Sequence, residues 1–356
     1  MKEKKGLGEI GRREERREGR VKGRIVMVMM VVMMVMGCNS GGVKDAEKVF
    51  LSEMVNLGKG FMEVFVSFGD MITGTLGIKA ETKKSEIGAY FTKIAETMKE
   101  VREKLGKILE ENGKYEKVKV KVEEFIGEIG KIEAGAKTAA SGASGDEAIG
   151  NATAAGQDAS HADFNSVNVL VAGIKAIVGV VLKDNEGKAG STKTDGEQQK
   201  TIGKLFEKKD NASEAEAAAA SASIGAISGA DVLRAIAESE SVVNNDGKID
   251  TAKNAAELAA AKKEDDKNEI KDAAKKDAVI AAGIALRAMA KDGKFAAKND
   301  KKSANAVNGV ASGVVNKVLS ALTIAIRNTV DGGLKEINKV LGEIKQGEGS
   351  VAKINE

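Results

Sequence analysis

The chain contains no proline in 356 residues, and this absence constrains its fold more than any other feature. Proline is the strongest helix breaker, because its ring clashes with the preceding turn and it donates no backbone hydrogen bond. Alanine, lysine and glutamate, which favour helices, are abundant, whereas strand-forming residues other than valine are sparse. We therefore predict an all-α, predominantly helical protein with glycine-rich loops and at most a few short strands.

Apolar residues spaced three and four apart indicate where the helices lie, because this spacing places them on one helical face. The first such face falls between residues 50 and 72. Its members are Phe50, Met54, Leu57, Phe61, Phe65, Phe68 and Ile72. We also predict helices at 85–111, capped by Ser85, and at about 115–137.

The second half of the chain gives less regular patterns. Residues 134–162 are a glycine, alanine and serine mixture without large apolar side chains, which we interpret as loops and frayed short helices. A short buried helix is expected at 167–182 and an alanine-rich helical stretch at 212–240. Residues 251–276 are predicted to form a charged, solvated helix.

The C-terminal region carries two clear apolar faces. The first contains valines and isoleucines from Val307 to Ile326 and is expected to end at Asp331-Gly332-Gly333. The same spacing resumes after this point, so a second helix is predicted there.

Twelve apolar residues, Ile25–Met36, follow a basic segment with ten Lys/Arg and five Glu in residues 1–24. As a helix this run would reach only about 18 Å, against a bilayer hydrocarbon core of about 30 Å. It suits the apolar region of a signal peptide instead.

The apolar run ends at the only cysteine of the chain, in the sequence Val35-Met36-Gly37-Cys38. A branched apolar residue, a spacer, a small residue and then cysteine make up a bacterial lipobox. We predict cleavage after Gly37 and lipid attachment to the Cys38 thiol, because two or more acyl chains form a stable membrane anchor. An incidental thiol beside a buried helix is the alternative. Residues 1–37 would then be a lipoprotein signal peptide, 38–48 a tether and 49–356 a single helical domain.

Charge and cysteine content exclude several classes of protein. Without residues 1–37, 46 basic and 48 acidic residues remain, so the apparent basicity belongs to the predicted signal peptide. A nucleic-acid partner is therefore not expected. A single cysteine also leaves no disulfide within the chain.

No constellation of residues predicts an enzyme, a metal site or a cofactor. Residues 242–253 resemble a calcium loop around Gly247, but Val242 and Lys253 occupy the first and last ligand positions, where carboxylates are needed. We interpret the segment as a solvated turn. His161 is the only histidine and is expected at the surface.

Three segments carry a family resemblance. NLGKGFMEVFVSFGDMITGTLGIKAETKKSEIGAYF, residues 56–91, resembles the N-terminal region of the variable large proteins of relapsing-fever Borrelia. Residues 275–300 resemble an invariable segment of those proteins and of the related variable surface antigen of Lyme-disease Borrelia. Residues 304–343 are similar to the C-terminal region of the same proteins.

The resemblance implies an elongated helical lipoprotein of the outer membrane, exposed at the cell surface and antigenically variable, so that host antibodies fail to recognise it. The variable, membrane-distal portion would lie at about 134–270, and the 275–300 helix would be largely buried. Its partners would be the membrane, through lipid on Cys38, and host antibodies. An adhesin for host glycans or matrix proteins, or a periplasm-facing binding lipoprotein, are the alternatives. A clustered basic patch would favour the adhesin.

Overall fold

The computed structural model describes residues 77–112, 114–264 and 268–344, together with four positions near residue 55. These four are Ser52, Val55, Asn56 and Gly58. The chain divides into two compact units, residues 1–54 and 55–356, and every helix below belongs to the second. The predicted signal peptide and most of the predicted helix at 50–72 lie outside the described residues.

The described part of the second unit consists of helices, and its only strand pairing is isolated bridges such as that between Gln157 and Ala297. The predicted all-α fold is confirmed. The helices are α3 (Lys84–Asn112), α4 (Glu116–Gly142), α5 (Phe164–Val181), α6 (Gly196–Thr201), α7 (Glu214–Ala226), α8 (Gly229–Ala237), α9 (Ala255–Ala260), α10 (Asp277–Met289) and α11 (Lys301–Gly342), with 3-10 turns η1 (Ile202–Phe206) and η2 (Lys209–Asn211).

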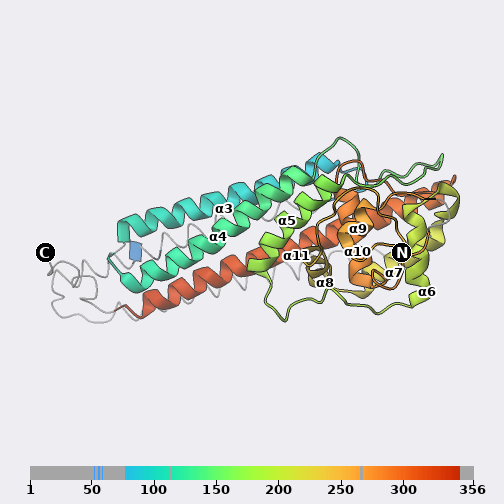
Figure 1. Ribbon diagram of the computed structural model, residues 1–356. Coiled ribbons are helices and arrows are strands. Elements are labelled where there is room, and N and C mark those ends of the chain that lie inside the picture. Colours follow the sequence, from blue (N-terminus) through green and yellow to red (C-terminus); the bar gives the residue numbers. More distant parts are fainter. Residues whose placement is uncertain are drawn as a thin grey trace, which may run out of the picture. The chain divides into compact units, whose positions relative to one another are not determined.

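Within this unit the long helices form one layer and the short helices gather beside the first half of α11. Helix α3 packs along α4, and α4 packs along α5 (Figure 1). Helix α11 contacts α4 and α5 and also α7, α8 and α10. The longest helix therefore joins the two groups.

Helix α4 is longer than its sequence pattern indicates, and the prediction of loops across residues 134–142 is wrong. Ala136 and Ala139 are completely buried against α5. A Cβ atom added at Gly173 of α5 would lie only 2.4 Å from the backbone nitrogen of Ala139. Small side chains here bring two helix backbones close together, so the segment buries its surface without large apolar groups.

Helix α11 continues unbroken through Gly332-Gly333, where the sequence predicted an end. A Cβ atom at Gly333 would lie 2.2 Å from the ring of Phe125 on α4, whose side chain is buried. Glycine is needed at this position for close approach of the aromatic ring rather than for a turn.

Replacing Gly333 by alanine is expected to destabilise the protein by about 1–3 kcal/mol, because the added methyl group overpacks the Phe125 ring. Gly332→Ala is the matched control, because nothing lies within 4 Å of a Cβ there. It should stabilise α11 by about 0.5–1 kcal/mol through helix propensity. Urea unfolding followed by circular dichroism measures both, and equal effects of the two substitutions would contradict this packing.

The prediction of a solvated helix over residues 251–276 is also wrong. Only α9 is helical there, and its Ala255 and Leu258 are completely buried. Leu258 lies beneath Gly283 of α10, where a Cβ atom would approach the Leu258 Cβ to 2.7 Å. The charged residues that follow are in irregular turns wherever they are described.

The start of α3 differs from the prediction by one residue. The helix begins at Lys84, and Ser85 does not cap it. The carboxylate of Glu86 instead accepts a hydrogen bond of 2.6 Å from the backbone nitrogen of Lys83. This is the reciprocal half of a capping box, which a reading based on serine alone misses.

Two of the described helices, α5 and α11, are long and apolar enough to cross a membrane by length and composition alone. Roughly half of the most apolar window of each is buried inside the protein, 44% in α5 and 50% in α11. Both helices contribute to the core, α5 through Leu170 and Ile174 and α11 through Val314. We therefore assign them as core helices.

Candidate functional surface

Helix α10 is the element on which the exposed loops depend. All thirteen of its residues, Asp277–Met289, are buried, which confirms the expectation of a buried helix within residues 275–300. It packs against α5, α7, α8, α9 and α11. Two of its buried residues, Asp277 and Arg287, are charged, and both bind segments that lead to the surface.

Asp277, at the first position of α10, holds the loop that precedes α6. Its Oδ2 accepts hydrogen bonds from the backbone nitrogens of Lys193 and Thr194, at 2.6 and 2.8 Å. Its Oδ1 accepts from the hydroxyls of Thr194 and Ser223, at 2.5 and 2.6 Å, and from the Gln199 amide at 3.0 Å. One buried carboxylate therefore joins a surface loop, α6 and α7.

Burial alone would raise the pKa of Asp277, but the hydrogen bonds from Ser223 and Thr194 outweigh it and hold the pKa below its usual value. Donors that favour the ionised form have this effect because protonation removes acceptor capacity that they require. The carboxylate is thus ionised although no cation bonds to it within the described contacts.

Arg287, in the last turn of α10, is completely buried and binds backbone carbonyls. Its Nε donates to Lys294 at 3.0 Å, and its Nη1 donates to Ala261 at 3.1 Å. The guanidinium also lies over the ring of Phe206, 4.9 Å from the ring centre. Arg287 therefore fixes the end of α9 and the turn that follows α10.

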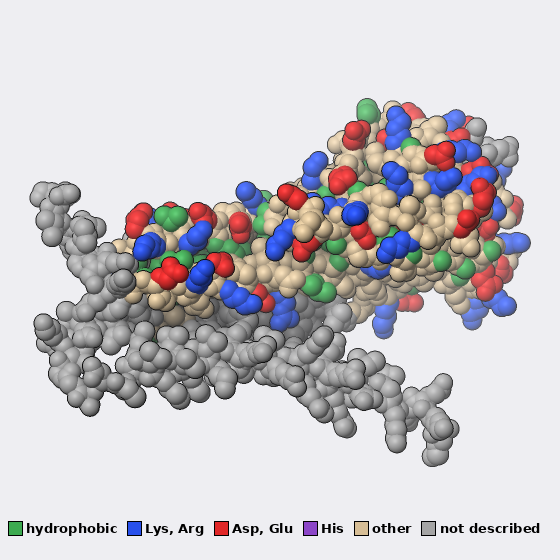
Figure 2. All heavy atoms as spheres, turned by 90° about the horizontal axis from the view of Figure 1, so that it is seen from below, with side chains coloured by type: hydrophobic (Ala, Val, Ile, Leu, Met, Phe, Trp, Pro, Cys, Tyr) green, Lys and Arg blue, Asp and Glu red, His purple; other side chains and the backbone are tan. Residues whose placement is uncertain are grey.

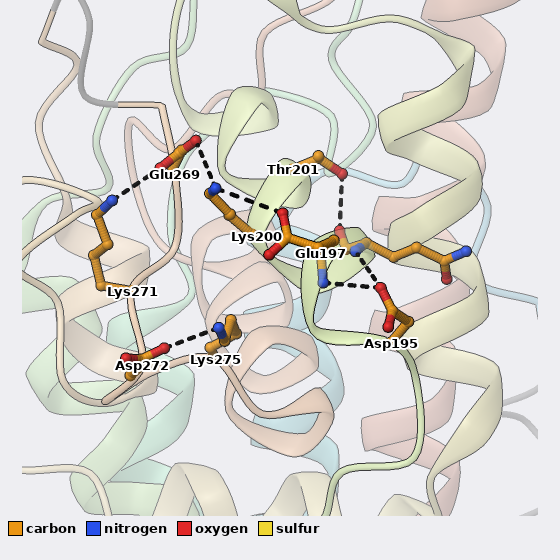
Figure 3. Close-up of polar contacts among 9 residues, drawn as sticks. Asp195, Glu197, Lys200, Thr201, Glu269, Lys271, Asp272 and Lys275 are labelled. Carbon is orange, nitrogen blue, oxygen red and sulfur yellow. Dashed lines mark hydrogen bonds and ion pairs between the residues drawn. The ribbon is translucent and has the colours of Figure 1, made fainter.

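An exposed group of ion pairs lies beyond these buried contacts, between α6 and residues 268–275 (Figure 3). Lys200 of α6 lies 3.2 Å from Glu269, which also pairs with Lys271 at 2.8 Å. Asp272 pairs with Lys275 at the same distance. Such pairs contribute little to stability, typically 0–1 kcal/mol each. We call Glu197, Lys200, Glu269, Lys271, Asp272 and Lys275 the charged loop surface.

The segment that resembled a calcium loop is a turn, and one of its residues has a structural role. The Asn245 side chain accepts from the Phe164 nitrogen and donates to the carbonyls of Ala162, at 2.7 Å, and Ala260, at 3.1 Å. These bonds join the turn to the start of α5 and the end of α9. Among the described residues, no group of three His, Cys, Asp or Glu side chains could hold a metal ion.

His161 is half-buried rather than at the surface as predicted. Its Nδ1 is enclosed and has no hydrogen-bond partner in the described part of the chain. The neighbouring Ala162 is completely buried, because its segment runs beneath α9 and the turn at 243–250. Burial of this polypeptide, which lacks large side chains, explains the difference.

Charges of both signs share the surface. A shallow hollow of about 870 Å³ lies between the first turns of α7 and α11, and its lining includes Lys298, Lys301 and Lys302 together with Glu214 and Asp300. Figure 2 shows basic and acidic side chains interspersed over the face that it draws. The clustered basic patch that would favour an adhesin is not found on this face.

The predicted lipid-attachment site, Cys38 with Val35, Met36 and Gly37, lies outside the described residues. It stays a prediction from sequence, as does the assignment of residues 38–48 to a tether and of about 134–270 to a variable portion.

A helical body that carries polar surface loops on a buried central helix is the architecture of a surface antigen rather than of an enzyme cleft. Residues 61–341 match the Borrelia lipoprotein family, and the chain belongs to that family. Variable large protein 4 of Borrelia hermsii is 53% identical over 328 residues, which cover 90% of this chain and 93% of that protein. Variable large protein 17 of the same organism is also 53% identical, with 90% and 92% covered.

A solved structure gives the same result for the fold. The Lyme disease variable surface antigen VlsE of Borrelia burgdorferi matches with a TM-score of 0.70 and 32% sequence identity. The match covers 82% of this chain and 98% of that one. The resemblance inferred from sequence is confirmed, and the relatives named here are variable antigens, none of them named as an enzyme.

Proposed function

We propose that the protein is a lipid-anchored outer-membrane protein, exposed at the cell surface, whose variable loops allow the cell to evade host antibodies. Its partners are the membrane, through lipid on Cys38, and the antibodies themselves. It performs no enzymatic reaction and uses no cofactor. Membership of a family of variable antigens supports this proposal.

The observation that carries it is the separation of loop surface from loop attachment. The charged loop surface is exposed, and its ion pairs join side chains that are all partly in solvent. Attachment depends on Asp277 and Arg287, which no antibody can reach because both are completely buried. Surface side chains can therefore change without loss of the fold, because the buried contacts that hold the loops go mainly to backbone atoms.

Reversing the charges of Lys200, Glu269, Lys271 and Asp272 tests this separation. We expect the unfolding free energy to change by less than about 1–2 kcal/mol, because only exposed ion pairs are altered. Antibodies raised against intact cells that carry the parent protein should lose a measurable fraction of their binding to the variant.

The matched control exchanges Lys121 and Glu124, an exposed pair 2.6 Å apart on α4, away from the charged loop surface. This variant should absorb the antibodies as completely as the parent protein does. Complete absorption by the loop variant, or a larger loss with the α4 exchange, would contradict the proposal.

A further inference from the structure

The amine of Lys84, at the first position of α3, is enclosed by backbone carbonyls from the end of α10 and the turn after it. The side chain is completely buried. Its Nζ donates to the carbonyl oxygens of Ala290 at 2.5 Å, Gly293 at 2.7 Å and Arg287 at 3.4 Å. The side chain thus joins two segments that are about 200 residues apart in the sequence.

The backbone around Lys84 forms a second set of contacts with residues 145–149. The Lys84 nitrogen donates to the Glu147 carbonyl and the Ser85 nitrogen to the Gly145 carbonyl, both at 2.9 Å. The Ile149 nitrogen donates to the Thr82 carbonyl at 2.8 Å. If the Lys84 side chain leaves its site, these three amides lose their protection from solvent.

Four charged groups act on the amine from the elements packed around it. Glu147, from the loop after α4, and Asp292, from the turn after α10, favour the ammonium form. Arg287 of α10 and Lys294 of the following turn oppose it. Lys294 also pairs with Glu147 at 2.8 Å, which reduces the effect of that carboxylate on Lys84. The nearby charges therefore offset one another, and burial dominates.

We propose that Lys84 is a pH-sensitive latch that holds the start of α3 on the end of α10. The latch is closed most firmly when the amine is neutral. When the amine takes up a proton, the buried charge favours an opened state in which water reaches it, and the first turn of α3 separates more often from residues 145–149 and 290–293.

The direction of the effect follows from the two states of the lysine. Burial lowers its pKa in the closed protein from 10.5 to about 7, whereas a solvated lysine in the opened state has the usual value. Between these values the opened state binds more protons, so opening becomes less frequent as the pH rises. From pH 7.0 to 8.5 the opening constant should fall by roughly fifteenfold, and below pH 7 it should level off.

Hydrogen exchange of the Lys84, Ser85 and Ile149 amides in the full chain measures this opening, after correction for the intrinsic pH dependence of exchange. The range stops at pH 8.5 because burial lowers the pKa of Arg287, the nearest buried cation, to about 9. We expect the fall in the parent protein and a pH-independent opening constant in Lys84→Met.

Lys317→Met is the matched control, because this half-buried amine also donates to two carbonyls, those of Ile224 and Ile227, both at 2.5 Å. It should leave the pH dependence at the start of α3 unchanged. A flat opening constant in the parent protein overturns the proposal whether or not Lys84→Met folds. The same holds if Lys84→Met retains the dependence or if Lys317→Met abolishes it.

Discussion

Arg287→Met is expected to lower the free energy of unfolding by about 3 kcal/mol or more. Methionine fills a similar volume but leaves the buried carbonyls of Ala261 and Lys294 without the donors that now bond to them. The contact between the guanidinium and the Phe206 ring is also lost. Urea unfolding at constant pH measures the change, and limited proteolysis should show earlier cleavage after α9 or after α10.

The same substitution at an exposed arginine gives the control for this prediction. Arg327 of α11 is partly exposed and lies 3.9 Å from Asp331 within its own helix, so Arg327→Met should change stability by less than about 0.5 kcal/mol. If the two substitutions cost the same, Arg287 does not hold the loops in the way the structure indicates.

Asp277→Asn is the second substitution with a large expected effect. The side chain keeps its shape, but one of its oxygens becomes an NH₂ group that must face donors, either the Lys193 and Thr194 amides or the Ser223 and Thr194 hydroxyls and the Gln199 amide. At least two hydrogen bonds are lost, so we expect a cost of about 2–4 kcal/mol at pH 7. The loop before α6 should become sensitive to protease.

The cost of Asp277→Asn should depend on pH. Because the pKa of Asp277 in the folded protein is lower than in the unfolded chain, its ionised form contributes stability above the unfolded value of about 3.9. That contribution disappears as the pH falls below this value and through the folded pKa. The difference in stability between the parent protein and Asp277→Asn should therefore shrink in acid.

Asp331→Asn is expected to show the opposite behaviour. Burial raises the pKa of Asp331, and Arg327 only partly offsets this effect, so ionisation of Asp331 opposes folding near neutral pH. Asparagine there should cost no stability at pH 7. A pH-independent cost at Asp277, or equal costs at both positions, would contradict the assigned hydrogen-bond networks.

Periodicity predicted the helices whose buried faces consist of large side chains, but not the contacts made by small ones. The face from Val307 to Ile326 is buried as expected. At Ala139 and Gly173, burial depends on how closely two backbones approach, and this is a property of the pair of helices that neither sequence shows alone. Gly333 looked like a helix end for the same reason, because the ring that requires it comes from Phe125, more than 200 residues earlier.

The buried charges that hold the loops gave a weaker signal. Arg287 stands alone in the apolar run AVIAAGIALRAM, and a charge in a buried helix requires polar partners. That much could have been predicted from sequence. Its partners could not, because they are carbonyl groups whose positions depend on irregular backbone at 258–261 and at Lys294.

Protease treatment of intact cells, followed by a blot for this protein, tests the proposed exposure at the cell surface most directly. A periplasmic protein on the same blot reports whether the outer membrane stayed closed. The account predicts that the band is lost or shortened while the periplasmic control survives. A full-length band that survives together with the control would place the protein inside the outer membrane and contradict its proposed role in evading antibodies.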